Sequence, residues 1–183
     1  MGARRHVAVA LIVPAPVGTE IDVLRRALDD RQLGRIEPHI TIIPPINLRD
    51  DALTEAMVLL DRVAARHASL PVSLGPVAGF GPGSRTRFLR VDPWDAVTAL
   101  HEDCWQGPFD RPRQRTFHPH VTIDIDGAPE HGDDPAAEIL AGYSAEVTFD
   151  RLTLLENVQA TDGQGDGRRW EPFCHYPLTG ERD

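Results

Sequence analysis

Cysteine is scarce in this chain of 183 residues, which contains only Cys104 and Cys174. A disulfide framework needs more than two cysteines, so we expect both thiols to be reduced and neither to be catalytic. Long apolar runs are missing as well, because no stretch reaches the about 18 residues that a membrane helix needs. Residues 1–13 lack the small-residue cleavage site of a signal peptide. We therefore expect a soluble protein of the cytoplasm with no membrane association.

Positive charge is also in short supply. The formal net charge is −9 at pH 7, whereas broad, non-specific nucleic-acid binding depends on many phosphate contacts from basic side chains. We therefore expect no long nucleic-acid surface, and small substrates or RNA ends stay open as partners. Because 41% of the residues are hydrophobic, the chain can still bury a substantial core.

The sequence does contain a five-residue phrase that occurs twice, as Pro-His-Ile-Thr-Ile at residues 38–42 and Pro-His-Val-Thr-Ile at residues 119–123. Chance would give about half of one His-x-Thr in a chain of this composition. The two histidines are 81 positions apart, close to the half-length of the chain, and their flanking residues match. This spacing indicates an internal duplication, in which each half supplies one histidine.

The phrase also predicts a chemical arrangement. Side chains at i and i+2 of a strand share a face, so His39 lies beside Thr41 and His120 lies beside Thr122. Two such strands across a cleft would bring two imidazoles and two hydroxyls around one point. An imidazole with a pKa near ~6.5 can take one proton and give another at neutral pH. The hydroxyls can donate hydrogen bonds to phosphate oxygens. A single copy would favour an ordinary buried histidine, but the repeat favours a catalytic pair.

Periodicity and turn residues predict an α+β fold in one domain that covers residues 1–183 and consists of two lobes. The strand that carries His39 is expected to end at Pro44-Pro45, because proline cannot donate to a sheet. The other strands are expected at residues 7–13, 72–77, 85–91, 117–125, 147–156 and 169–178. Helices are expected at residues 19–30, 50–67, 92–106 and 135–141, with a loop at residues 107–115.

Several features together resemble the two-histidine (2H) phosphoesterases, and among these the 2′-5′ RNA ligase-like branch of RNA 2′,3′-cyclic phosphodiesterases. They are the duplicated His-x-Thr, the Pro-Pro after the first copy, Phe-His-Pro-His-Val-Thr-Ile at residues 117–123, and a first apolar strand that ends in Pro-x-Pro. The similarity spans roughly residues 7–178.

This resemblance implies a bilobal duplicated fold, with antiparallel sheets lining a central cleft and helices on the outside. It also implies metal-independent, cofactor-free cleavage of 2′,3′-cyclic or 2′-5′ linked nucleotide or RNA phosphates. His39 and His120 would be the catalytic pair, and Thr41 and Thr122 would bind the phosphate. After the second copy the chain continues Asp124-Ile125-Asp126, where many relatives carry a basic or neutral residue. Two carboxylates near the cleft disfavour long RNA as the substrate.

Residues next to the second copy are candidates for substrate binding. Arg115 follows Arg111 and Arg113 just before this copy and is placed to guide a phosphate, although such clusters are more often solvated surface. Phe117 is a candidate for stacking on a base, and His118 for touching the substrate.

Two alternatives stay open. His118 and His120 have the i, i+2 spacing that lets both rings reach one Zn²⁺, and His39 would complete a set of three ligands. A zinc-dependent hydrolase would not explain why threonine follows each motif histidine at the same offset. The second alternative is a non-catalytic nucleotide-binding module that keeps the cleft without turnover.

Overall fold

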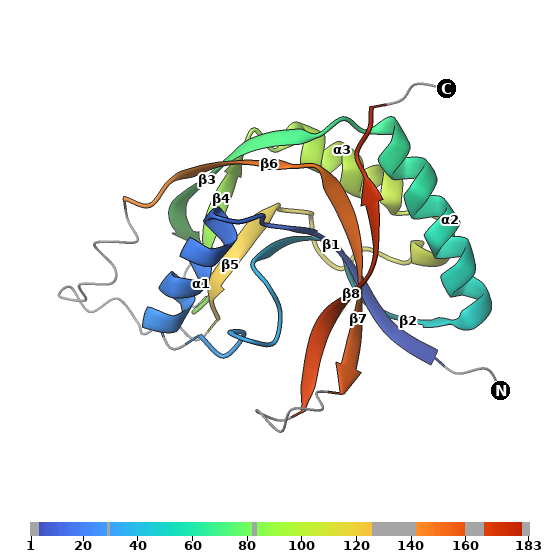
Figure 1. Cartoon of the computed structure of the whole chain (residues 1–183), viewed down its shortest axis with the longest axis horizontal. Helices are drawn as coiled ribbons and strands as arrows, with labels where there is room; N and C mark the ends of the chain where they lie inside the picture. The colour runs from blue at the N-terminus through green and yellow to red at the C-terminus, as the bar shows by residue number, and fades with distance from the viewer. Residues whose placement is uncertain (1–3, 29, 82–83, 126–141, 160–166, 181–183) are drawn as a thin grey trace.

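The structure is a computed structural model that describes residues 4–28, 30–81, 84–125, 142–159 and 167–180. Within these ranges the chain forms eight strands, three α-helices and one 3-10 helix (Figure 1). The elements are β1 (Arg4–Ile12), α1 (Val17–Ala27), β2 (His39–Arg49), α2 (Asp50–Arg66), β3 (Leu70–Gly79), β4 (Arg87–Asp92), α3 (Asp95–Cys104), η1 (Gly107–Phe109), β5 (His120–Asp124), β6 (Ala145–Phe149), β7 (Arg151–Gln159) and β8 (Arg168–Pro177).

The eight described strands join into one antiparallel sheet with the order β6-β3-β4-β5-β2-β1-β7-β8. This arrangement confirms the expected α+β class. Four strands lie on each side of the β5–β2 junction, and each inner strand carries one His-x-Thr motif. The origin of the two halves by duplication stays a prediction.

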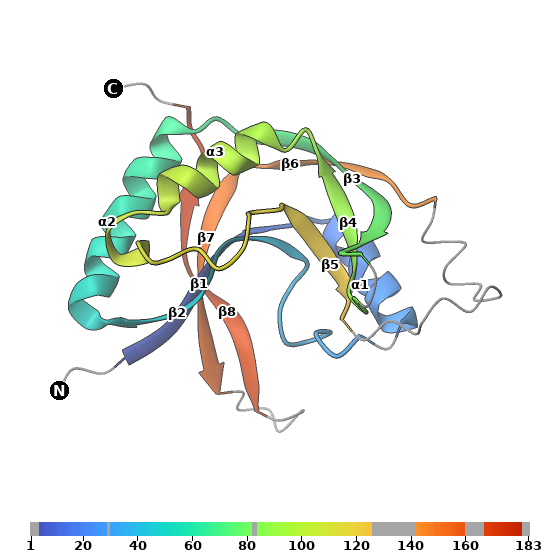
Figure 2. The same cartoon turned by 180° about the vertical axis from the view of Figure 1, so that it is seen from behind.

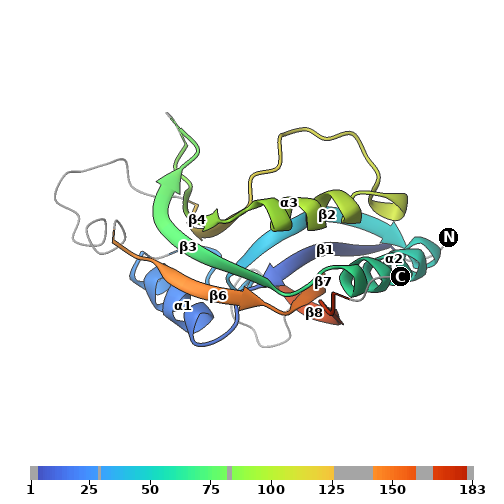
Figure 3. The same ribbon diagram turned by 90° about the horizontal axis from the view of Figure 1, so that it is seen from above.

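The helices cover the two halves of the sheet differently. Helices α2 and α3 pack against each other, and they contact the half formed by β1, β2, β7 and β8 (Figure 2). Helix α1 contacts β5 of the other half. Figure 3 shows from above how β6 and β3 run alongside each other into the region of α2 and β7. Within the described residues, no helix has the length and apolar content to cross a membrane.

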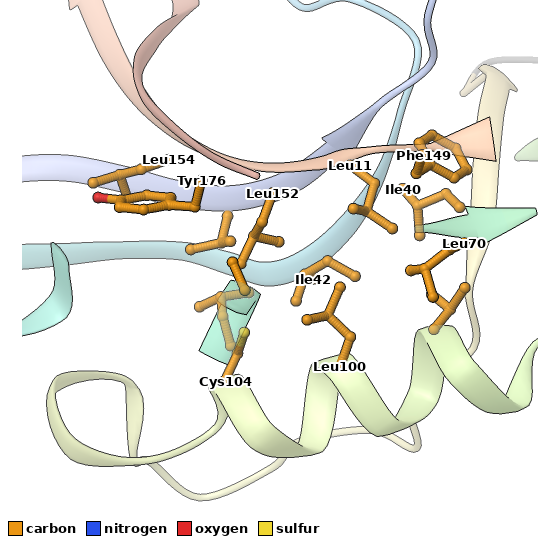
Figure 4. Close-up of a cluster of buried hydrophobic side chains, with 14 of the residues drawn as sticks. Leu11, Ile40, Ile42, Leu70, Leu100, Cys104, Phe149, Leu152, Leu154 and Tyr176 are labelled. Atoms are coloured by element: carbon orange, nitrogen blue, oxygen red, sulfur yellow. The ribbon is translucent and has the colours of Figure 1, made fainter. Parts of the chain in front are cut away.

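The main core lies between α2, α3 and one face of the sheet. Leu11, Ile40 and Ile42 are fully buried there, and Figure 4 shows Leu100 and Cys104 of α3 pointing toward this layer. The opposite face of β1 carries alanines instead of large side chains. Because side chains alternate along a strand, this face has room for a pocket.

The sheet differs from expectation at Pro44-Pro45, where the strand does not end but continues to Arg49. The ladder with β1 pairs Val9 with Ile43 and then Val7 with Ile46, so both prolines fall in an irregular step of the register. A β-bulge does not need every backbone N–H in the ladder. The prolines are therefore accommodated without ending the strand.

The strand expected at residues 147–156 is in fact two strands with different partners. Before Asp150, β6 pairs with β3, and after it β7 pairs with β1. The carbonyl of Asp150 accepts a 2.8 Å hydrogen bond from the Leu178 amide, so the chain leaves one ladder here and joins another. Periodicity predicts the extended conformation of this segment but contains no information about the change of partner.

Other boundaries shift by a few residues. Helix α1 begins at Val17, before the expected cap at Thr19, and helix α3 begins at Asp95, after the expected start at Asp92. Strand β5 is shorter than expected at His120–Asp124, and a 3-10 turn occupies part of the expected loop. The helix expected at residues 135–141 lies outside the described residues.

The core predicts a clear contrast between two substitutions. Leu100→Ala removes a fully buried side chain, and we expect it to lower the free energy of unfolding by about 2–5 kcal/mol. Val58→Ala on the outer face of α2, where Val58 is 65% exposed, should change it by less than about 0.5 kcal/mol. Urea unfolding of both variants measures this difference, and equal losses would contradict the assigned core.

Candidate functional site

The two His-x-Thr motifs meet at the β2–β5 junction. Ile40 and Val121 are partners there, and both side chains point into the core. Continuing this antiparallel register by one residue places His39 opposite Thr122 and His120 opposite Thr41. Opposed residues share a face, so these four side chains lie together on the face away from the core. Each histidine therefore neighbours the threonine of the other motif.

A pocket of about 220 Å³ opens on this face. The pocket is lined by His39, Thr41 and Thr122. Among the residues that the structure describes, His120 lies beside Thr41 but does not line the pocket. The remaining wall is largely apolar and includes Ala8, Ala10, Ile36, Leu155 and Trp170. None of His6, His67, His101 and His175 lines this pocket.

The two imidazoles are held in the same way. Nδ1 of His39 lies 2.7 Å from the carbonyl oxygen of Glu37, and Nδ1 of His120 lies 2.6 Å from that of His118. A carbonyl oxygen only accepts, so each Nδ1 carries a hydrogen and donates it. In the neutral ring, Nε2 is then the free basic nitrogen. Each strand thus fixes the ring tautomer through the residue two positions earlier.

The environment of each ring favours its neutral form. Burial, opposed by the hydrogen bond to Glu37 and aided by the charges of Arg25 and His120, lowers the pKa of His39 to about 4. Burial also lowers the pKa of His120, against the effect of its hydrogen bond to the His118 carbonyl. Both rings are therefore bases in the free protein at neutral pH.

Sequence reasoning missed Arg25 of α1, whose side chain is 1% exposed and lines the pocket. Its Nε donates to Asp30 Oδ2 at 3.0 Å, and its Nη1 donates to the Ile36 carbonyl at 3.0 Å and to Asp22 Oδ1 at 3.3 Å. Arg25 lies four positions after the buried Ile21 on the helix. The sequence did contain a signal for Arg25, namely a charged residue on the apolar stripe of this helix. Long charged side chains are rarely buried without partners, so a charge at such a position marks a candidate functional residue.

The unusual Asp124 after the second motif has a partner. It is 3% exposed, and its Oδ2 accepts hydrogen bonds from Arg87 of β4 at 2.7 and 3.1 Å. The carboxylate is therefore balanced by a guanidinium and repels a bound phosphate less than its sequence position suggests. The other carboxylate of this segment, Asp126, lies outside the described residues.

Phe117 and the arginine cluster lie away from the pocket lining. The Phe117 ring stacks on His101, with centroids 3.8 Å apart, on the side of α3. Arg111 donates to the carbonyls of Pro44 and Pro45, and Arg113 pairs with Glu102. These contacts attach the loop to the protein body. Arg115 is exposed on this loop, and its role in binding a phosphate stays a prediction.

His118 lies in a different setting, among aromatic rings next to His120. Its ring centroid is 6.3 Å from that of His120, 5.5 Å from Phe88 and 5.8 Å from Trp94. The contact of His118 with a substrate stays a prediction. Among the described residues, no group of three histidine, cysteine or carboxylate side chains is arranged to hold a metal ion. The zinc alternative therefore stays a prediction for the chelator experiment below.

The partly buried His39 predicts a pH dependence of stability. Folding lowers its pKa from 6.5 to about 4, so between these values the unfolded chain binds more protons at this position. The free energy of unfolding should therefore fall as the pH drops from 6.5 to about 4. His39→Gln should lose less stability over this window, while His175→Gln, at an exposed position, should follow the wild type. Urea unfolding across the window tests this, and parallel curves for wild type and His39→Gln would contradict it.

Comparison with known sequences gives a family. The profile of the 2′-5′ RNA ligase superfamily matches residues 13–161. A protein of Geobacillus kaustophilus (strain HTA426) with the name "Putative phosphoesterase GK0864" is 31% identical over 132 residues, covering 71% of this chain and 76% of that protein. Another from Oceanobacillus iheyensis, named "Putative phosphoesterase OB1230", is 25% identical over 171 residues, covering 93% and 96%.

Solved structures share the fold at low sequence identity. The apo crystal structure of E. coli LigT has a TM-score of 0.69 and 19% identity, with 97% of this chain and 99% of LigT covered. TT0787 of Thermus thermophilus has a TM-score of 0.61 and 17% identity, with 97% and 100% covered. The fold agrees over nearly the whole chain, and the profile covers both His-x-Thr motifs. The chain therefore belongs to the 2′-5′ RNA ligase superfamily of two-histidine phosphoesterases.

Proposed function

We propose that this phosphoesterase opens 2′,3′-cyclic phosphates, or cleaves 2′-5′ linkages, in small nucleotides or at RNA ends, without a metal ion. The observation that carries the proposal is the pair of imidazoles with matching Nδ1 hydrogen bonds to backbone carbonyls. This arrangement leaves two Nε2 atoms on one face of the sheet, beside two threonine hydroxyls. Two such groups can move one proton in each direction around a phosphate.

His39 is suited to be the general base. Its pKa of about 4 keeps the ring neutral at physiological pH, and the buried Arg25 opposes its protonation. In ring opening, a water oxygen bonds to phosphorus while the bond from phosphorus to one ribose oxygen breaks. Nε2 of His39 takes the proton that the water loses.

His120 is suited to be the general acid. Its ring meets the ring of Phe80 edge-on, at 4.9 Å between centroids, and lies 5.1 Å from Phe88. Aromatic faces stabilise a nearby cation, and a bound phosphate would counteract the lowering of the His120 pKa by burial. The protonated ring then gives its Nε2 hydrogen to the leaving ribose oxygen. The hydroxyls of Thr41 and Thr122 donate to the non-bridging oxygens, where negative charge develops.

Relatives of known structure support a nucleotide substrate. Crystal structures of E. coli LigT are titled as complexes with 3′-AMP and with phosphate, at 19% identity to this chain and TM-scores of 0.70 and 0.65. Those ligands belong to LigT. In this chain the pocket beside His39 combines polar and apolar walls, which suits a phosphate attached to a nucleoside.

Substitution of either histidine should stop turnover. We expect His39→Ala and His120→Ala each to lower kcat on a nucleoside 2′,3′-cyclic phosphate by about 10²–10⁴-fold. The double variant should be little worse than the worse single one, because residues of one catalytic unit are not additive. His67→Ala is the control, since His67 bonds to Asp103 outside the pocket. Additive losses would contradict a shared transition state.

The chelator experiment separates the acid–base enzyme from its alternatives. Activity should persist in excess chelator, and the loss of activity with restoration by Zn²⁺ would establish the zinc enzyme instead. Absence of turnover on cyclic and 2′-5′ linked substrates, together with nucleotide binding that survives His39→Ala, would establish the binding module.

The pH profile should be bell-shaped and its kcat/KM maximum should lie on the acid side of pH 6.5. A free-enzyme base with a pKa of about 4 gives the rising limb, and a free-enzyme acid with a pKa below 6.5 gives the falling limb. The kcat profile should lie at higher pH, because the negative phosphate raises both pKa values in the complex. A kcat/KM maximum above neutrality would contradict these environments.

A leaving-group test assigns the two roles. A nucleoside phosphodiester with a p-nitrophenyl leaving group needs little protonation of that group. We expect it to restore much of the activity lost in His120→Ala and little of that lost in His39→Ala. The opposite pattern would exchange the base and the acid.

A further inference from the structure

Strand β4 extends the catalytic face beyond His120. In the β4–β5 ladder, Arg90 is the partner of His120 and Phe88 is the partner of Thr122. Opposed residues of an antiparallel pair share a face, so Arg90 and Phe88 lie on the same face as the motif side chains. Arg90 is exposed, and in the described part of the chain no ion pair or hydrogen bond engages its side chain. A free guanidinium thus borders the motif histidine on the side away from the pocket.

Aromatic rings gather around the same position. Phe80, just after β3, packs on Phe88 with 4.4 Å between centroids and lies 6.1 Å from His118. The ring centroid of Trp94 lies 5.8 Å from that of His118. Phe80 is 50% exposed and Trp94 is 46% exposed, although large aromatic side chains usually bury more of their surface. Together Arg90, Phe80, Trp94 and His118 form a patch, here called the β4 patch, that borders His120.

We propose that the β4 patch binds the nucleotide that precedes the reacting one, so that the preferred substrate is an oligonucleotide end and not a mononucleotide. Arg90 would hold the 5′-phosphate of the reacting nucleotide, and the preceding base would stack on Phe80 and Trp94. This inference rests on the proposed function, since it takes the reacting phosphate to lie between His39 and His120.

The spacing of the strands suits this assignment. Neighbouring strands lie ~4.8 Å apart, and the long side chain of an arginine extends beyond one such step. A phosphate next to the reacting one is therefore within reach of an arginine one strand away. Stacking on aromatic rings accepts any base, which suits an end of unspecified sequence. The patch is small, in keeping with a protein of net charge −9 that holds one extra nucleotide.

Three substrates separate the contributions of the patch. They are a nucleoside 2′,3′-cyclic phosphate, the same compound with a 5′-phosphate, and a dinucleotide that ends in the 2′,3′-cyclic phosphate. The wild type should show rising kcat/KM along this series. Arg90→Gln should reduce the gain from the 5′-phosphate by about tenfold, the effect of one lost charge-assisted hydrogen bond. Phe80→Ala should reduce the further gain from the second nucleoside by about tenfold.

Matched variants away from the patch serve as controls. Arg62→Gln changes an exposed arginine of α2, and Phe173→Ala changes an aromatic ring of β8 that is 41% exposed. Both should keep the substrate ratios within about twofold of the wild type. Equal kcat/KM values along the series in the wild type, or ratios unchanged by both patch variants, would overturn the proposal.

A failure of the proposed function can be told apart from a failure of the β4 patch. If none of the three substrates turns over, binding of a dinucleotide with a 3′-phosphate is measured by titration. Weaker binding in Arg90→Gln and Phe80→Ala, with the controls unchanged, would support the patch without the catalysis. Unchanged binding in the patch variants would reject the patch as well.

Discussion

The site depends on one short contact between two strands, the antiparallel pairing of β2 with β5 at Ile40 and Val121. This pairing brings together two motifs that are 81 positions apart in the chain. If one strand slipped by one residue against the other, its histidine and threonine would turn into the core. The register is held because Ile40 and Val121 are fully buried, so the same hydrophobic layer stabilises the fold and sets the geometry of the site.

Ionic pairs around this junction keep charges in a largely buried region balanced. Arg25 of α1 pairs with Asp30, and Arg87 of β4 pairs with Asp124 of β5. Burial raises the pKa of Asp30, against the effects of a hydrogen bond from the Gln32 backbone and of the Arg25 charge. Such pairs contribute little net stability, but removal of one partner leaves an uncompensated charge. Their place beside the pocket suggests a role in setting its potential.

The sequence was sufficient for features that depend on local patterns. The duplicated phrase singled out His39, Thr41, His120 and Thr122, and the alternation of polar and apolar residues predicted their common face. Helix α2 was predicted almost to the residue, because its apolar stripe and acidic first turn are both local signals.

Features that depend on partners distant in sequence were out of reach. The bulge that accommodates Pro44 and Pro45 exists only against β1, and the division at Asp150 exists only because β3 and β1 lie in different halves of the sheet. The environment of Arg25 likewise requires the segment around Ile36 to fold back over α1. Propensity and periodicity describe a segment by itself and contain none of these contacts.

The two motifs are alike, yet their surroundings are not. On the β1 side, alanines, Leu155 and Trp170 form a recessed apolar wall next to His39. On the β4 side, the exposed ring of Phe80 lies beside His120, and the exposed ring of Trp94 lies beside His118. The backbone hydrogen bonds that orient the two imidazoles are the same. The two halves are therefore alike at the motif histidines and differ around them. Under the proposed mechanism the reaction is asymmetric around the phosphate, because the attacking water lies on one side and the leaving ribose oxygen lies with its nucleoside on the other. The two halves differ on the neighbouring strands, which carry neither motif, so under the proposed mechanism these strands can follow the asymmetry of the substrate without disturbing the two histidines.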